Sequence, residues 1–210
     1  MTFRCYAWSV SFPVCRSKIW LFAASVVLAF LFSGCSTPLA TGYQTYTITE
    51  GAGYMSFEYP ARIPPKTVQL AEDSSYTMID LYGPVMPQDR TRTRIWVTVT
   101  RDASQAATAA LHLQSALGIA ETLAGYSFID RSFLTLGGEQ AEQIVYANVL
   151  SRTDYEIRVL HLSPVTMFNR QIFLSHNGAV WTISMTASEQ NFDSDTPDFG
   201  HLINTFEFLD

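Results

Sequence analysis

The chain has 210 residues, of which 48% are hydrophobic and 15% charged, and its formal net charge is −6. The charge is uneven, because residues 1–34 carry three basic residues and no acid, whereas the rest carries ten Lys and Arg against all 19 Asp and Glu, a net −9. A domain with this much negative charge lacks the basic face that binding of nucleic acid requires, and we therefore expect no nucleic acid partner. The high hydrophobic content also argues against a disordered chain.

The first 34 residues are predicted to be a secretory signal peptide. Residues 19–32 form a predominantly apolar run of 14 residues, which is short for a membrane-spanning helix of about 20 residues. The run is preceded by the basic Arg16 and Lys18, the order that is typical of a signal peptide.

A cysteine follows the apolar run directly, in Ser33-Gly34-Cys35. Small residues before a cysteine at this place resemble the lipobox of bacterial lipoproteins. The resemblance implies cleavage before Cys35 and acylation of its thiol and new N-terminus by fatty acids such as palmitate. Phe32 departs from the Leu that usually stands three residues before the cysteine, and an ordinary signal or an uncleaved anchor is the alternative.

The use of cysteine agrees with this assignment. Cys5 and Cys15 leave with the signal and Cys35 is blocked by lipid, so the mature domain has no free thiol and no disulfide. This excludes thiol enzymes, zinc-thiolate sites and iron–sulfur sites. Residues 35–42 are expected to be the lipidated cysteine and a flexible tether, which binds the membrane through acyl chains.

The expected location is the cell membrane or the outer membrane, with the domain facing the periplasm or the exterior. Ser36 is not the Asp that retains some lipoproteins in the inner membrane of Gram-negative bacteria. In a host with two membranes this favours the outer one.

Residues 43–210 are predicted to form a single domain that begins with strands. Pro64-Pro65 cannot supply ladder donors and is expected in a loop, as are residues 83–92. TRIWVTVTR is the clearest strand, because Ile95, Val97 and Val99 line one side of it. The strands predicted in this part are 43–49, 54–59, 67–71, 76–82 and 93–101.

A helix is predicted over 106–124, with Asp102 or Ser104 as its cap and Gly125 as its end. Asn177-Gly178 predicts a tight hairpin turn. A last helix is expected to begin at Asp195-Thr196-Pro197, with proline at the first helical position. The remaining strands are predicted at 126–136, 140–150, 155–163, 166–176 and 179–187, with a short one at 206–208.

Several of these strands carry apolar residues on both sides, as where Val180 stands opposite Trp181 and Ile183. In a sheet with one face exposed to solvent, apolar and polar residues would alternate more regularly along each strand. The predicted fold class is therefore α+β, with a central antiparallel β-sheet and helices packed on both faces.

The order of elements and several short motifs resemble the PsbP-like superfamily, which includes the extrinsic photosystem II subunit, Mog-type Ran-binding proteins and small bacterial lipoproteins. The resemblance covers roughly residues 43–210 and implies an αβα sandwich with a non-catalytic binding or assembly role. It carries over no functional residue, because the matched positions are those of turns and core. The motifs are Phe57-Glu58-Tyr59-Pro60, Gly125-Tyr126, Leu136-Gly137-Gly138-Glu139-Gln140-Ala141, Asn177-Gly178-Ala179-Val180-Trp181-Thr182-Ile183 and Leu202-Ile203-Asn204-Thr205-Phe206-Glu207-Phe208.

The sequence holds no familiar catalytic signature: no Gly-x-Ser-x-Gly elbow, phosphate loop, dinucleotide fingerprint or His-Glu-x-x-His. We therefore assign no catalytic residue, no metal ligand and no cofactor. The four histidines of the domain lack metal-ligand spacing and are interpreted as isolated surface or half-buried residues; they are His112, His161, His176 and His201.

Two charged clusters each allow two interpretations. Asp193, Asp195 and Asp198 either cap the last helix and favour its positive end, or bind a hard cation such as calcium. The run from Arg90 to Arg94 either forms the solvated face of an edge strand, with Arg90, Arg92 and Arg94 pointing the same way, or meets an anionic partner.

Six tyrosines lie in the N-terminal third. Core packing and cross-strand pairing account for most of them, whereas an exposed aromatic patch would mark a binding face. They are Tyr43, Tyr46, Tyr54, Tyr59, Tyr76 and Tyr82.

Three functions fit these observations. The first is a lipid-anchored envelope protein, a non-catalytic binding or assembly factor with an envelope protein partner. The alternative is an envelope lipoprotein that binds a small molecule or metal, which needs a pocket with convergent polar groups. The third is an envelope hydrolase whose site joins distant residues such as Asp80, Glu156 and His161.

Overall fold

The computed structural model describes residues 42–209 except 64, 71–74 and 102–107. The predicted signal peptide, Cys35, nearly all of the tether and the two proposed helix caps, Asp102 and Ser104, lie outside these residues. Within the described part of the chain, no helix is both long and apolar enough to cross a membrane.

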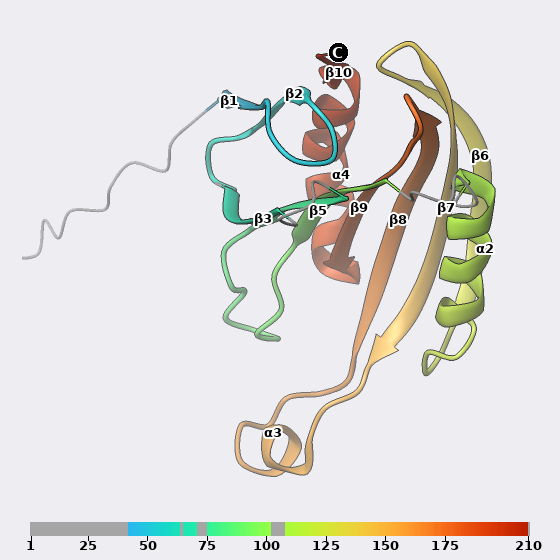
Figure 1. Cartoon of the computed structure of the whole chain (residues 1–210). Helices are drawn as coiled ribbons and strands as arrows, with labels where there is room; N and C mark the ends of the chain where they lie inside the picture. Colours follow the sequence, from blue (N-terminus) through green and yellow to red (C-terminus); the bar gives the residue numbers. More distant parts are fainter. Residues whose placement is uncertain (1–41, 64, 71–74, 102–107, 210) are drawn as a thin grey trace, which may run out of the picture. The chain divides into compact units, whose positions relative to one another are not determined.

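An antiparallel sheet of seven strands forms the centre of the domain (Figure 1), in the order β3-β4-β5-β9-β8-β7-β6. The turn between β8 and β9 is the predicted Asn177-Gly178 hairpin, with positive φ at both residues (47° and 71°), as a tight turn of this kind requires. The strands are β3 (Pro65–Leu70), β4 (Tyr76–Tyr82), β5 (Arg94–Arg101), β6 (Ser127–Leu136), β7 (Glu139–Leu150), β8 (Val165–His176) and β9 (Ala179–Ser188).

One long helix packs on each face of this sheet, as Figure 1 shows. Helix α2 (Ala109–Ala120) and helix α4 (Glu189–Asn204) both contact β8 and β9. They use opposite faces, because Phe173 packs in the α2 core whereas its neighbours Ile172 and Leu174 pack in the α4 core. The fold class is thus α+β with an antiparallel sheet between helices, as predicted.

A second, three-stranded sheet closes the α4 side, and the sequence did not predict it as a separate sheet. It pairs β1 (Tyr43–Ile48), β2 (Met55–Pro60) and β10 (Glu207–Phe208) in the order β1-β2-β10. Phe57 of β2 is fully buried, and its ring stacks on Phe206 with centroids 6.1 Å apart. This sheet therefore seals the larger of the two cores.

The strand predicted at 155–163 is wrong. This segment begins with the short helix α3 (Asp154–Arg158) and continues without a strand to residue 164. Thr153 and Glu156 form a capping box, in which each side chain accepts a hydrogen bond from the other's backbone N–H. Such a box pairs two backbone N–H groups of the first helical turn that would otherwise lack acceptors. It stabilises a helix here, although the alternation of apolar residues suggested a strand.

The predicted ends of the other two helices also need correction. The N-cap of α2 is Thr108, and the helix ends at Ala120, before Gly125. Helix α4 begins at Glu189, eight residues before the predicted first helical residue Pro197, so Pro197 lies inside it. Proline removes one helical hydrogen bond, and Asp193, whose carbonyl loses its partner, is exposed.

Strand β3 also starts earlier than predicted, because Pro65, expected in a loop, is its first residue. The pairing with β4 shifts directly after it, between Pro65 and Thr67. A proline is tolerated at the start of an edge strand beside such a bulge, where no ladder donor is lost.

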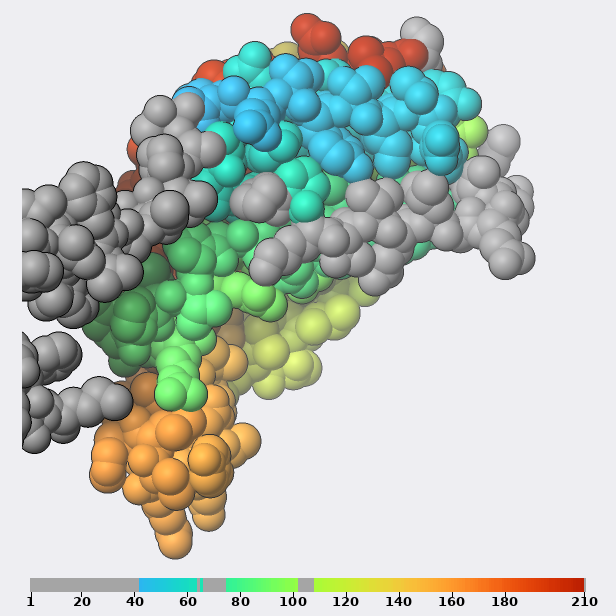
Figure 2. Space-filling view, turned by 90° about the vertical axis from the view of Figure 1, so that its left-hand side faces the viewer, coloured from blue at the N-terminus to red at the C-terminus, as the bar shows by residue number. Residues whose placement is uncertain are grey.

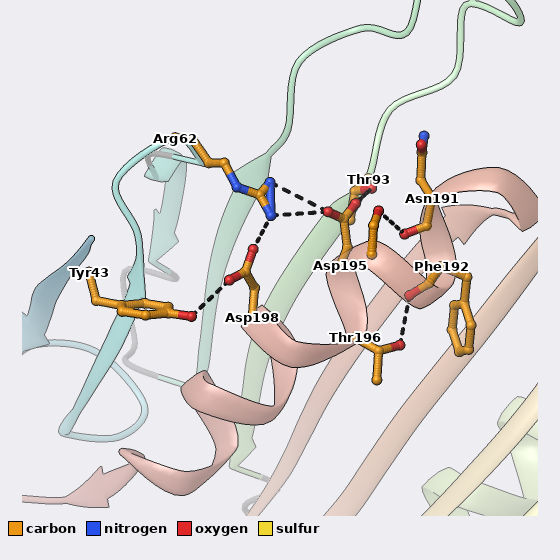
Figure 3. A network of polar contacts seen from close by, with 9 residues as sticks. Tyr43, Arg62, Thr93, Asn191, Phe192, Asp195, Thr196 and Asp198 are labelled. Atoms are coloured by element: carbon orange, nitrogen blue, oxygen red, sulfur yellow. Dashed lines mark hydrogen bonds and ion pairs between the residues drawn. The ribbon is translucent and has the colours of Figure 1, made fainter. Parts of the chain in front are cut away.

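Arg62, in the turn after β2, binds two carboxylates of α4 that also contact two other parts of the fold (Figure 3). Its guanidinium donates to Asp195 at 3.1 Å and to Asp198. Thr93 donates its hydroxyl to Asp195, and the Tyr43 hydroxyl donates to Asp198 at 2.9 Å. This hydrogen bond to Asp198 raises the pKa of Tyr43 above its usual value. The two carboxylates thereby fix α4 to β1, to the turn after β2 and to the start of β5.

Glycine is needed at position 53 because a Cβ there would lie 2.5 Å from the buried ring of Trp181. We expect Gly53→Ala to lower the free energy of unfolding by about 1–3 kcal/mol, the usual cost of overpacking a core. Gly118→Ala, inside α2 with open space around it, should instead raise it by about 0.5–1 kcal/mol. Urea unfolding of both variants checks the pair; equal stability of the two would contradict this account.

Arg62→Gln should lower the free energy of unfolding by about 2 kcal/mol, because it leaves two largely buried carboxylates without their cation. Arg131→Gln is the matched control, since the Arg131–Glu142 pair is largely exposed on the arginine side and exposed pairs contribute little. Urea unfolding measures both changes. A loss in Arg131→Gln as large as that in Arg62→Gln would refute the structural role of the Arg62 cluster.

Candidate functional site

A groove of about 520 Å³ lies between α2 and the sheet face beneath it. Strands β5, β9 and β8 form its floor, and one side of α2 forms its wall. We call it the α2 groove. Its lining consists of Trp96, Leu111, His112, Ser115, Ala116, Ile119, Gln171, Phe173, Thr182 and Ser184.

The floor holds a polar row that runs across three strands. Strand register places Trp96 beside Ser184, and Ser184 beside Gln171. Oγ of Ser184 and Oε1 of Gln171 are buried and have no hydrogen-bond partner within the described chain. A buried polar atom left unpaired destabilises a fold by about 1–3 kcal/mol, so these two oxygens of the groove floor are held at a cost in stability.

The wall of the groove is apolar and partly exposed. Leu111 and Ile119 expose 53% and 63% of their surface, and they lie with Ser115 at steps of four along one side of α2, a spacing that aligns side chains. Leu113, Leu117 and Ala120 pack inward from α2, whereas Ala110 is exposed. A sequence signal for the groove is the pair of large apolar residues, Leu111 and Ile119, that lie off this inward-facing side.

His112 is half-buried in the groove wall. No hydrogen bond among the described residues joins His112 to Ser115 or Ser184. His112 is the one ionisable side chain among the ten lining residues. The lining therefore offers apolar contact and hydrogen bonds, which is the usual composition of a small-molecule site.

The other histidines lie apart. His201 hydrogen-bonds Glu58 at 2.6 Å and stacks on Tyr43, whereas His176 contacts Glu139 at 3.2 Å. Among the described residues there is no group of His, Cys, Asp and Glu side chains that fits a metal ion.

The basic run does not lie on an edge strand, so that interpretation is wrong. Strand β5 is paired on both sides, by β4 and β9, and it begins only at Arg94; Arg90 lies in the preceding turn. The guanidinium carbon of Arg92 lies 4.0 Å from the centroid of the Tyr82 ring. That of Arg94 lies 5.6 Å from Tyr82 and 4.7 Å from Trp96. We call Tyr82, Arg92, Arg94 and Trp96 the arginine–aromatic stack.

Arg94 is held in this stack by an acid. Its Nε donates to Asp80 at 2.7 Å, and the side chain of Asp80 is only 5% exposed. This hydrogen bond raises the pKa of the Arg94 guanidinium above its usual value. Arg94 is therefore a fixed, compensated cation.

The acidic cluster is engaged within the fold. Asp195 and Asp198 bind Arg62 from inside α4, so neither caps the helix, and Asp193 is exposed. An internal guanidinium thus occupies the position that a cation would take between the two carboxylates (Figure 3).

The three residues considered for a hydrolase have separate surroundings. Asp80 pairs with Arg94. Glu156 accepts from the backbone and hydroxyl of Thr153, hydrogen bonds that lower the pKa of Glu156. His161 lies beyond α3, exposed to solvent.

Helix α3 lies at the far end of the β7–β8 pair and projects from the sheet (Figure 1). Figure 2 shows the same segment, in orange, below the green loop that precedes β5. Arg152 joins the two by donating to the carbonyl of Asp89. Three apolar side chains of this tip are largely exposed, namely Tyr155 (63%), Ile157 (45%) and Val159 (56%).

The N-terminal tyrosines form no single patch. Tyr59 is buried, and Tyr46 packs against Phe57 with ring centroids 5.6 Å apart. Tyr43 and Tyr54 expose 42% and 46% of their surface. Packing thus accounts for most of the six.

No protein-family model matches the chain, and no curated protein matches it in sequence. Solved structures do match. Cyanobacterial PsbP (CyanoP) from Synechocystis shares 11% identity over 84% of this chain and 98% of its own, with a TM-score of 0.50. LpqN of Mycobacterium tuberculosis, which is involved in cell envelope biogenesis, shares 17% identity over 82% and 99%, with a TM-score of 0.46. The Ran-binding protein Mog1p of Saccharomyces cerevisiae shares 8% identity over 81% and 97%, with a TM-score of 0.46.

At such low identity, similarity in structure bears on the fold and not on function. CyanoP matches over 98% of its own length with a TM-score of 0.50. The chain therefore has the PsbP-like fold that its motifs predicted.

Proposed function

We propose that this chain is a lipid-anchored, non-catalytic binding protein of the cell envelope, which takes a small amphiphilic molecule into the α2 groove. The observation that carries the proposal is the polar row of the groove floor, where Ser184 and Gln171 bury unpaired oxygens beside the indole of Trp96. A fold retains such atoms at a cost in stability, and a ligand that hydrogen-bonds them recovers that cost.

The composition of the groove favours an amphiphile. Leu111, Ile119 and Phe173 supply apolar contact, whereas the floor supplies hydrogen bonds. Small-molecule sites combine a mostly apolar lining with a few convergent polar groups in the same way. The volume of about 520 Å³ lies within the usual range of about 300–1,000 Å³.

The predicted lipid on Cys35 explains how such a protein stays at its membrane. Acylation at a cysteine that follows a signal peptide gives more than one acyl chain, and two chains anchor a protein stably where one does not. An acidic domain has little attraction of its own for anionic lipid, so the proposal assigns membrane attachment to the acyl chains alone.

A second candidate function is binding of an envelope protein through the α3 tip. Tyr155, Ile157 and Val159 lie on the α3 tip, where 63%, 45% and 56% of their surface is exposed. Exposed apolar groups of this kind mark protein contact surfaces when they cluster. A Tyr155→Ser, Ile157→Ser double variant that loses a co-purifying protein but keeps a groove ligand would assign the two functions to separate surfaces.

Cys35→Ser should remove the lipid and move the protein out of the washed membrane fraction, because the acyl chains are its proposed anchor. Metabolic labelling with tritiated palmitate, followed by fractionation, measures both effects. Cys15→Ser is the control, since Cys15 is expected to leave with the signal peptide. Palmitate label that persists in Cys35→Ser would contradict the assignment.

Ser115→Trp should empty the groove, because position 115 is an exposed lining residue and a large ring there fills the space beside Leu111 and Ile119. Native mass spectrometry of the lipoprotein from its own membranes should detect a bound small molecule in the wild type and none in this variant. Gln114→Trp, exposed on the same helix and outside the lining, should keep it. An empty wild-type groove, or a ligand retained by Ser115→Trp, would count against the proposed function.

A further inference from the structure

We propose that the α2 groove selects amphiphiles with an acidic head group, and that Arg92 of the arginine–aromatic stack receives that group. The inference rests on the proposed function and adds the chemical class of the ligand and its orientation. It follows from three observations: the position of the stack, the balance of charges there and the shape of the groove.

The stack begins where the groove ends. Trp96 belongs to both, because it lines the groove and also carries Arg94 over its ring at 4.7 Å. Arg94 and Trp96 lie two residues apart on the same face of β5, about 7 Å along the strand. Tyr82 lies directly opposite Arg94 on β4, and Arg92 covers Tyr82. A molecule that fills the groove beside Trp96 therefore has the guanidinium groups next to its end.

The charges of the stack do not cancel. Arg94 is paired with the buried Asp80, so one acid compensates one base. Arg92 is exposed, and no carboxylate of the described chain forms an ion pair with it. None of the ten lining residues of the groove is acidic. The stack thus holds one uncompensated positive charge on an otherwise acidic domain, and a carboxylate or phosphate would form a charge-assisted hydrogen bond with it.

The apolar wall of the groove favours a ligand with an apolar tail. From Leu111 to Ile119 the helix rises about 12 Å at about 1.5 Å per residue, and both end residues are largely exposed. A free phosphate or a short acid would leave this wall uncovered. A single alkyl chain with an acidic end satisfies the wall, the polar row and Arg92 together.

Tryptophan fluorescence reports directly on this arrangement. After residue 34 the chain has two tryptophans, Trp96 and Trp181, and Trp181 is only 2% exposed. A bromine atom quenches an indole only at close contact. Quenching by a brominated probe is therefore expected to come from Trp96 in the groove.

The experiment uses the mature lipoprotein in phosphatidylcholine nanodiscs, titrated at neutral pH with 2-bromododecanoic acid and with 2-bromododecanol, whose bromine lies beside the head group and therefore near Trp96. The acid should quench at about fivefold lower concentration than the alcohol, because it alone offers a charge to Arg92. Arg92→Gln should remove this difference. Arg90→Gln, which removes the same charge from the preceding turn without touching the stack, should keep it.

The outcomes separate this inference from the proposed function. Equal quenching by acid and alcohol would overturn the acidic head group and leave groove binding intact. A preference for the acid that survives in Arg92→Gln would overturn the role of Arg92. Quenching that persists in Trp96→Phe would place the probe outside the groove and overturn the inference. Absence of quenching by either probe, together with an empty groove in native mass spectrometry, would overturn the proposed function as well.

Discussion

The structure depends on covering both faces of one sheet, because its central strands carry apolar side chains on either side. The α4 face is the more fully covered: within the described chain, α4, β1, β2 and β10 bury Ile172, Leu174 and the adjoining side chains of β5 and β9. Among the described residues, the other face is covered by α2, a helix of 12 residues. Its packing reaches Ile144, Tyr146 and Phe173 and stops short of β5. The α2 groove is the space left by this unequal cover.

The closed side is fixed by charge as well as by packing. Arg62 binds two carboxylates of α4 that are 12% and 14% exposed, and removal of one partner of such a set is costly because the others stay buried. The same acids engage Tyr43 and Thr93, so α4 cannot shift without breaking contacts to three segments. No comparable set of ion pairs among the described residues joins α2 to the sheet, where Leu113 and Ala120 make apolar contacts and the Ala109 backbone N–H donates to Ser175.

Local signals in the sequence predicted most strands, the hairpin at Asn177-Gly178 and the fold class, because side-chain alternation and turn chemistry act over a few residues. These signals failed where a longer-range contact or a competing local motif determined the structure. The box of Thr153 and Glu156 replaced a strand with a helix. The groove was missed for another reason: Trp96, Ser184 and Gln171 are distant in sequence and meet only through strand register.

The polar row lowers the stability of the fold but gives the groove hydrogen-bonding groups for recognition. Valine or leucine at 171 and 184 would remove two unpaired buried oxygens, and apolar replacement of such groups is often neutral or stabilising. The same replacement would leave the groove uniformly apolar beneath Trp96. It would then hold an alkyl chain in any orientation, with nothing to fix its polar end. Hydrogen-bonding groups in the floor and guanidinium groups at one end fix the orientation of a bound amphiphile. A site that fixes this orientation can distinguish one amphiphile from another, which apolar contact alone cannot do.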